Sequence, residues 1–99
     1  MGSNVIVYGW KQSIPGRESL SGQHFQEFLQ YLQQQKEQGA IESYEPVLLE
    51  PHSGDLHGFF LIKGEPSKLA SLTGSPEWVQ HQVRATLDMT GMSLMRGVG

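Results

Sequence analysis

One short segment of the chain is apolar on both faces of any strand that it could form. Residues 58–64 read Gly-Phe-Phe-Leu-Ile-Lys-Gly. Successive side chains of a strand point to opposite faces of the sheet, so Phe59 and Leu61 share one face. Phe60 and Ile62 then share the other face. A strand with one solvated face alternates apolar with polar residues instead, so we expect both faces of this sheet to be covered.

A second segment, Asn4 to Trp10, is β-branched and aromatic and is also apolar on both faces. The chain contains enough helix to cover only one face of a sheet. The simplest cover for the other face is a second copy of the same protein. These two segments therefore predict a homodimer.

Composition limits the size and the class of the protein. A chain of 99 residues with 37% hydrophobic content fits a single domain over residues 1–99. The formal net charge is −3 and the seven basic residues are scattered, which argues against nucleic acid as a partner. The absence of cysteine excludes thiolate nucleophiles and thiolate metal sites. No signal-peptide core and no apolar stretch near 18 residues is present, so we expect a cytoplasmic protein with no membrane contact.

Apolar residues recur at helical spacing after Ser19 and Ser21, either of which can cap a helix. They are Leu20, Phe25, Phe28, Leu29 and Leu32. Lys36 and Gly39 predict the end of this helix. A second strand is predicted over Ile41 to Leu49. Because proline cannot donate a hydrogen bond to a neighbouring strand, Pro46 places this strand at an edge or on a bulge.

The second half of the chain repeats the alternation of strand and helix. A turn over residues 51–55 leads into the apolar segment and predicts an antiparallel hairpin. A short helix is predicted from Glu65 to Leu72. Ser75 and Pro76 then start another helix, which ends at Gly91. Apolar residues line one face of that helix, namely Val79, Val83 and Leu87. A last strand is predicted over Met92 to Val98.

The predicted order of elements is β-α-β-β-α-β. Two right-handed halves of this kind form an α+β, ferredoxin-like domain with a four-stranded antiparallel sheet and its helices on one face. The strand order is fourth, first, third, second. The two central strands are then the two that are apolar on both faces.

This pattern resembles the dimeric α+β barrel superfamily, and within it the YCII-related proteins. The segments that carry the resemblance are Gly58-Phe59-Phe60-Leu61-Ile62, a glycine-started apolar strand after a turn, and Ser75-Pro76-Glu77-Trp78, a proline-containing helix start. The resemblance implies a dimer in which two sheets pack face to face. Ser75 stands where that group carries an acidic residue, so its His–Asp pair is not reproduced here. Other branches include cofactor-independent monooxygenases, isomerases and dehalogenating enzymes.

Four residues are candidates for a site. Tyr8 and Trp10 share one face of the first strand and could wall a cleft for a small organic ligand, or belong to the core or the dimer interface. His24 lies in the first helix near the face that packs on the sheet. It could act as the catalytic acid–base, or be a boundary histidine bonded to the backbone. Arg96 could bind a carboxylate with two hydrogen bonds, or form an ordinary ion pair.

Three further polar residues lie close together around the predicted turn, namely His52, Asp55 and His57. Imidazole and carboxylate groups are suitable zinc ligands, but their spacing matches no specific motif and an exposed turn explains them more simply. We therefore predict no metal and no cofactor. The resulting hypothesis is a dimer that binds a small organic molecule in a cleft between helices and sheet. The alternatives are a cofactor-independent monooxygenase, isomerase or lyase, and a non-catalytic assembly or regulatory module.

Overall fold

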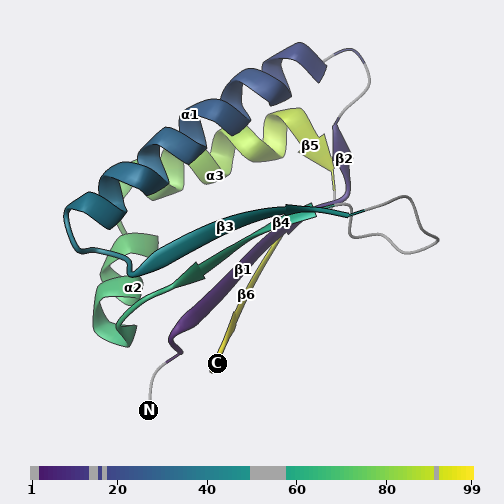
Figure 1. Ribbon diagram of the computed structural model, residues 1–99. Helices are drawn as coiled ribbons and strands as arrows, with labels where there is room; N and C mark the ends of the chain where they lie inside the picture. Colours follow the sequence, from purple (N-terminus) through teal and green to yellow (C-terminus); the bar gives the residue numbers. More distant parts are fainter. Residues whose placement is uncertain (1–2, 14–15, 17, 50–57, 91) are drawn as a thin grey trace.

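The computed structural model describes residues 3–13, 16, 18–49, 58–90 and 92–99, and it contains three helices and six strands within them (Figure 1). In chain order these are β1 (Val5–Trp10), β2 (Gln12–Ser13), α1 (Glu18–Glu37), β3 (Ser43–Leu48), β4 (Gly58–Lys63), α2 (Pro66–Thr73), α3 (Pro76–Asp88), β5 (Met89–Thr90) and β6 (Ser93–Gly97). Four of the strands form one antiparallel sheet, and β2 pairs with β5 as a short separate ribbon. The predicted α+β chain with a four-stranded antiparallel sheet is confirmed.

The four-stranded sheet has the order β3-β4-β1-β6. Strands β1 and β4 lie at its centre and are the two segments that are apolar on both faces. Their register pairs Val7 with Leu61 and Tyr8 with Phe60. The strand that carries Pro46, β3, lies at an edge of the sheet. An edge strand has no neighbouring strand on its outer side, so a backbone N–H that is missing there costs no hydrogen bond between strands.

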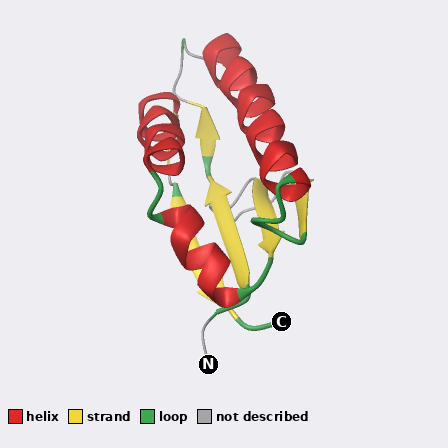
Figure 2. Cartoon of the chain, turned by 90° about the vertical axis from the view of Figure 1, so that its left-hand side faces the viewer, coloured by secondary structure: helices red, strands yellow, loops and turns green. Residues whose placement is uncertain are grey.

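Helices α1 and α3 lie side by side over one face of the sheet, and α2 lies near one end of it (Figures 1 and 2). The layer between helices and sheet is aromatic. The ring of Phe28 on α1 lies 4.9 Å from Phe60 on β4 and 5.6 Å from Trp78 on α3, centroid to centroid. Tyr8 on β1 closes this cluster, 5.9 Å from Phe28. None of the described helices is long and apolar enough to cross a membrane.

The end of α1 and the start of α3 follow the predicted local signals, but α1 begins at Glu18, so Ser19 and Ser21 lie inside the helix and neither caps it. Helix α1 ends before Gly39, whose φ of 82° is a left-handed conformation that glycine adopts without strain. The backbone N–H of Ala40 then donates to the carbonyl oxygen of Gln35 at 2.9 Å. Helix α3 begins at Pro76, and the hydroxyl of Ser75 accepts a hydrogen bond from the backbone N–H of Trp78 at 3.4 Å, as expected of a capping residue.

Helix α3 buries a different face from the one that its apolar spacing indicates. Val79, Val83 and Leu87 do share one face, but they are 45%, 54% and 59% exposed. Trp78 is 1% exposed and Ala85 6% exposed, so their face of the helix packs inward. Burying one tryptophan removes more apolar area from water than burying a valine does. The helix also ends at Asp88, three residues before Gly91, because the chain enters the β2–β5 ribbon there.

The face of the sheet that points away from the helices is also apolar. We call it the open face; its apolar residues are Val5, Val7, Val47, Phe59, Leu61 and Met95. Strand alternation places them opposite the buried Ile6, Tyr8, Phe60 and Ile62. Met95 is 48% exposed and the other five side chains are half-buried. The described part of the chain therefore leaves one sheet face without a layer on it.

Candidate functional site

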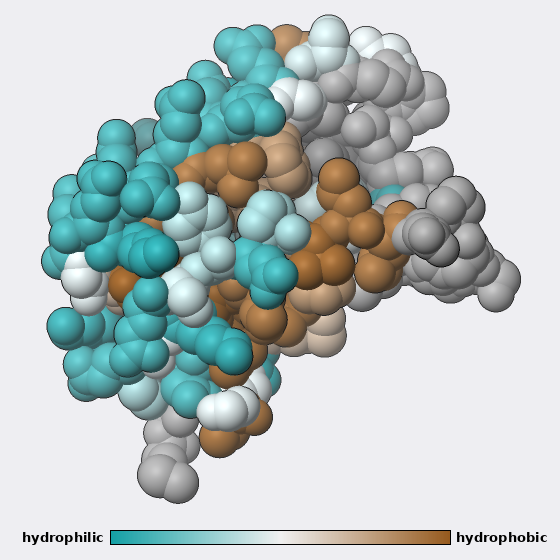
Figure 3. Space-filling view, in the orientation of Figure 1, coloured by the Kyte–Doolittle hydropathy of each residue, from teal (hydrophilic) through white to brown (hydrophobic). Residues whose placement is uncertain are grey.

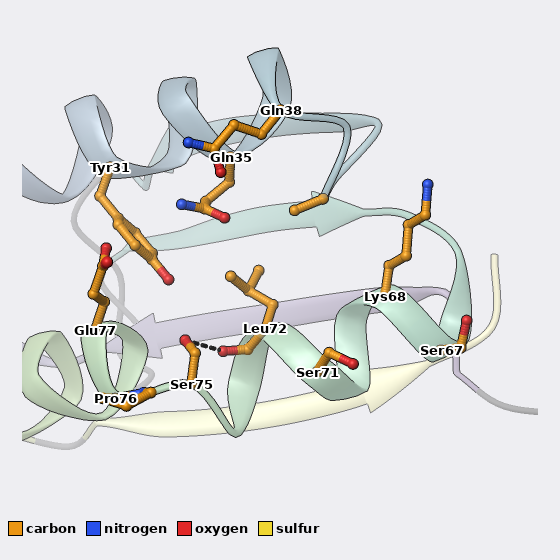
Figure 4. Close-up of a pocket in the computed structure, with 11 residues that line it drawn as sticks. Tyr31, Gln35, Gln38, Ser67, Lys68, Ser71, Leu72, Ser75, Pro76 and Glu77 are labelled. Carbon is orange, nitrogen blue, oxygen red and sulfur yellow. Dashed lines mark hydrogen bonds between the residues drawn. The ribbon is translucent and has the colours of Figure 1, made fainter.

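A cleft of about 530 Å³ opens where the C-terminal half of α1 faces the junction between α2 and α3. Most of the residues that line it are polar. They are Tyr31, Gln35 and Gln38 from α1, Ala40 after it, Ser67, Lys68, Ser71 and Leu72 from α2, Ser75 between the helices, and Pro76 and Glu77 from α3 (Figure 4). The cleft lies where a helix end, a helix turn and a helix start meet, so three elements contribute side chains to it.

Tyr31 and the start of α3 form one end of this cleft. Tyr31 is 5% exposed. Burial raises the pKa of Tyr31, a hydrogen bond with the Ser75 side chain lowers it, and the nearby Glu77 carboxylate raises it. The Ser75 hydroxyl also donates to the carbonyl oxygen of Leu72 at 2.7 Å (Figure 4). This end of the cleft therefore presents a neutral phenol, a hydroxyl and a carboxylate.

The rest of the lining adds amide and ammonium groups. In Figure 4 the Gln35 side chain extends from α1 toward α2, and Lys68 lies at the opposite end of the cleft from Glu77. The Lys68 ammonium donates to the carbonyl oxygen of Gly39 at 3.4 Å. Apolar contact comes from Leu72, among others. Such a mixture of donors, acceptors and a few apolar groups suits a small polar organic molecule.

Tyr8 and Trp10 lie in the core, 4% and 7% exposed, and line neither this cleft nor a smaller cavity beside Arg96. Burial raises the pKa of Tyr8 to about 12. Its hydroxyl has no hydrogen-bond partner among the described residues. Trp10 packs on Phe25 and Phe60, at centroid distances of 6.0 and 5.4 Å. Of the three roles considered for these residues, namely cleft wall, core and dimer interface, the geometry favours the core.

His24 is buried between α1 and α3, where it is 6% exposed. Its Nε2 lies 3.3 Å from Nδ1 of His81 on α3, and the two rings are nearly parallel. Burial and the charge of Arg84 lower the pKa of His81, while Glu27 and Glu77 raise it less. The His81 ring lies 4.7 Å from Tyr31, centroid to centroid. His24 is therefore not a lining residue of the cleft, but two ring contacts connect it to Tyr31.

Arg96 lies on edge strand β6, on the face of the sheet that the helices cover. Its Nη2 donates to the Thr73 hydroxyl at 3.0 Å. It lines a cavity of about 220 Å³ between α2 and the sheet. The structure thus places Arg96 at a cavity between α2 and the sheet, apart from Tyr8, Trp10 and His24.

The structure brings together residues that sequence patterns did not single out. Tyr31 lies three residues after Phe28 and Gln35 four after Tyr31, so both continue the inward stripe of α1, which is the signal that could have found them. His81 meets His24 across 57 residues, and no local pattern predicts that contact. The polar residues of the predicted turn, His52, Asp55 and His57, lie outside the described residues. Within the described ranges, no three His, Asp or Glu side chains gather closely enough to hold a metal.

Comparison with known proteins adds no relative, since no family model and no curated protein matches this chain. The arrangement of the sheet and helices is compatible with a ferredoxin-like fold. The likeness to YCII-related proteins therefore rests on the pattern of the chain alone.

Proposed function

We propose that this protein is a homodimer that binds a small polar organic molecule in the cleft between α1, α2 and α3. The observation that carries the ligand proposal is the cleft itself, about 530 Å³ with hydroxyl, amide, ammonium and carboxylate groups on its walls. Small-molecule sites span roughly 300–1,000 Å³ and combine apolar walls with a few polar groups. The neutral Tyr31, Gln35, Ser71 and Ser75 favour a ligand rich in hydroxyl or amide groups over a strongly charged one.

The proposed ligand site can be tested by thermal unfolding of the protein with a panel of sugars, polyols, amino acids and small amides. We expect at least one compound class to raise the melting temperature at millimolar concentration, because a ligand that binds only the folded state stabilises it. Ser71→Trp fills the cleft and should abolish the shift. Thr86→Trp, on the exposed side of α3, is the matched control and should keep it. A panel that gives no shift, or a shift that survives in Ser71→Trp, contradicts the proposed site.

The dimer proposal is supported by the open face. Val7, Leu61 and Met95 lie side by side across three strands at its centre. Two sheets that pack face to face lie about 10 Å apart, with the side chains of both inner faces interdigitating. A second copy placed on the open face would cover these residues and remove the one apolar sheet surface that the described chain leaves uncovered.

Native mass spectrometry tests the dimer. We expect a dimer for the unmodified protein and a monomer for Leu61→Asp, because the charge would lie within the apolar interface. Val83→Asp, on the exposed face of α3, is the matched control and should remain dimeric. A monomer for the unmodified protein, or a dimer that tolerates Leu61→Asp, contradicts a sheet-to-sheet interface.

A second candidate is an enzyme of the cofactor-independent monooxygenase, isomerase or lyase kind with His24 as acid–base. The contacts from His24 through His81 to Tyr31 support it, since they lead from a buried imidazole pair to the wall of the cleft. The test is incubation of a ligand found in the panel with the protein, followed by mass spectrometry of that ligand. Turnover that His24→Ala abolishes, with binding and the dimer retained, favours the enzyme. Binding without turnover favours a binding protein, and a dimer without any ligand favours an assembly module.

A further inference from the structure

The cavity beside Arg96 is separate from the cleft and differs from it in chemistry. It has a volume of about 220 Å³ and is lined by Ser3, Ile6, Pro66, Leu69, Ala70 and Arg96. A water molecule in the liquid occupies about 30 Å³, so the cavity offers roughly the space of seven waters. It lies between α2 and the strands β1 and β6, on the helix-covered side of the sheet. Its size limits any occupant to a molecule of a few heavy atoms.

Arg96 supplies the cationic group of this cavity and is held in place. Its Nη2 donates to the Thr73 hydroxyl at 3.0 Å. That hydroxyl in turn lies 3.2 Å from the carbonyl oxygen of Leu69 and 3.3 Å from that of Ala70, either of which can accept its hydrogen. A guanidinium carries five N–H donors in a planar fork, and one is engaged here. Among the residues that the structure describes, no carboxylate forms an ion pair with Arg96. Arg96 is an exposed residue, and its remaining donors are available to bind an anion.

The rest of the cavity wall is mostly apolar. Ile6 is 1% exposed and Leu69 3% exposed, and Pro66 and Ala70 complete this wall. An inorganic anion would gain nothing from such a surface, whereas each methylene buried against it contributes about 0.8 kcal/mol by transfer from water. A carboxylate with a short hydrocarbon chain satisfies both sides of the cavity. We propose that this cavity is a binding site for a short-chain monocarboxylate, with the carboxylate on Arg96 and the alkyl chain against Ile6, Leu69 and Ala70.

The test is titration of the ¹⁵N-labelled protein with sodium butyrate and sodium hexanoate, followed by NMR, with acetate and butylamine as matched controls. We expect saturable shifts for the backbone amides of α2 and β6. The affinity should be highest for a carboxylate with an alkyl chain, lower for acetate and absent for butylamine. Arg96→Gln should weaken butyrate binding about 10- to 100-fold, because a hydrogen-bonded charge pair is lost. Arg84→Gln removes a distant surface cation and should leave it unchanged.

Ala70→Phe provides a second variant that keeps the cation and fills the apolar side. It should weaken hexanoate binding more than acetate binding, while Arg96→Gln weakens both. The proposal is overturned if neither butyrate nor hexanoate shifts these amide signals at about 10 mM, roughly a 50-fold excess over the protein. At that concentration even a weak site with a Kd of about 1 mM would be mostly occupied. Equal binding of butylamine and butyrate, or unchanged butyrate binding by Arg96→Gln, would overturn it as well.

Discussion

Gly58 is the residue whose substitution tests the packing of the core most directly. A Cβ atom at this position would lie 2.5 Å from Cζ2 of Trp10, and 2.9 and 3.0 Å from two further atoms of the same ring. Nonbonded carbon atoms are in favourable contact at about 3.5–4.0 Å. In Gly58→Ala the indole ring must therefore retreat by about 1 Å. Phe25 and Phe60 pack on that ring at centroid distances of 6.0 and 5.4 Å, so the retreat is opposed.

The magnitude follows from two opposing effects. Forcing an extra methyl group into a packed core costs about 1–3 kcal/mol. Replacing glycine by alanine also reduces the conformational entropy of the unfolded chain, which stabilises the fold by about 0.4–1 kcal/mol. The difference between these two ranges runs from zero to about 2.6 kcal/mol, so we expect Gly58→Ala to lower the free energy of unfolding by up to about 2.6 kcal/mol.

Urea denaturation of the variant and the unmodified protein at equal concentration measures this difference. Gly22→Ala on the exposed side of α1 is the matched control, because a Cβ there meets no atom within 4 Å. In a helix interior the same change stabilises by up to about 1 kcal/mol. The two substitutions should thus have opposite signs.

Two results would refute the packing argument. One is a Gly58→Ala variant that is as stable as Gly22→Ala. The other concerns the double variant with Trp10→Phe, whose smaller ring leaves room for the added methyl group. If the two substitutions are additive to within about 0.5 kcal/mol, Trp10 is not the neighbour that Gly58 must accommodate.

Three further predictions concern the buried ring systems. First, burial and Arg84 lower the pKa of His81 below its usual 6.5, so the unfolded chain binds more protons than the folded one just below that pH. His81 should therefore make the free energy of unfolding fall as the pH drops below about 6.5, and should contribute no pH dependence above it. In His81→Gln the urea midpoints at pH 5.5 and pH 7.5 should differ less than they do in the unmodified protein. An unchanged pH dependence in the variant contradicts this. Second, Tyr8→Phe should leave the free energy of unfolding unchanged or raise it by up to about 1 kcal/mol in urea denaturation, because it removes a buried hydroxyl without a described partner. If Tyr8→Phe instead lowers the free energy of unfolding by more than about 1 kcal/mol, the hydroxyl is hydrogen-bonded. Third, Phe28→Leu should cost about 1–2 kcal/mol, measured in the same way, because it removes edge-to-face contacts with Tyr8, Phe60 and Trp78. A cost no greater than that of Leu29→Val on the same helix would show that these ring contacts add nothing to simple burial.

Candidate site residues were predicted less well than the fold, for a reason that particular residues make clear. Arg96 was a candidate because a guanidinium can bind a carboxylate with two hydrogen bonds, and in the structure it lines a cavity. Tyr31 and Gln35 look like ordinary members of an amphipathic helix until α2 and α3 are placed opposite them. Tyr8 and Trp10 carry polar atoms that a ligand could use, yet the helices cover them completely enough to make them core residues.

The amino-acid sequence by itself predicted the main helices and the four strands of the larger sheet, but not the β2–β5 ribbon. Strand alternation marks β1 and β4 as apolar on both faces, Pro46 favours an edge position or a bulge for β3, and Ser75 with Pro76 starts α3. Each of these signals acts through the backbone or through neighbours within a few residues, so it is the same in any tertiary context.

The tertiary structure alone decided which face of α3 is buried and which histidines meet. The helix offers two faces with apolar residues, one with Val79 and Val83 and the other with Trp78 and Ala85. The second is buried because Trp78 fits against Phe28 and Tyr8, which lie 50 and 70 residues earlier in the chain. The contact between His24 and His81 and the shape of the cleft follow from that choice. Packing energy depends on the partner surface, and the partner surface exists only once distant segments have come together.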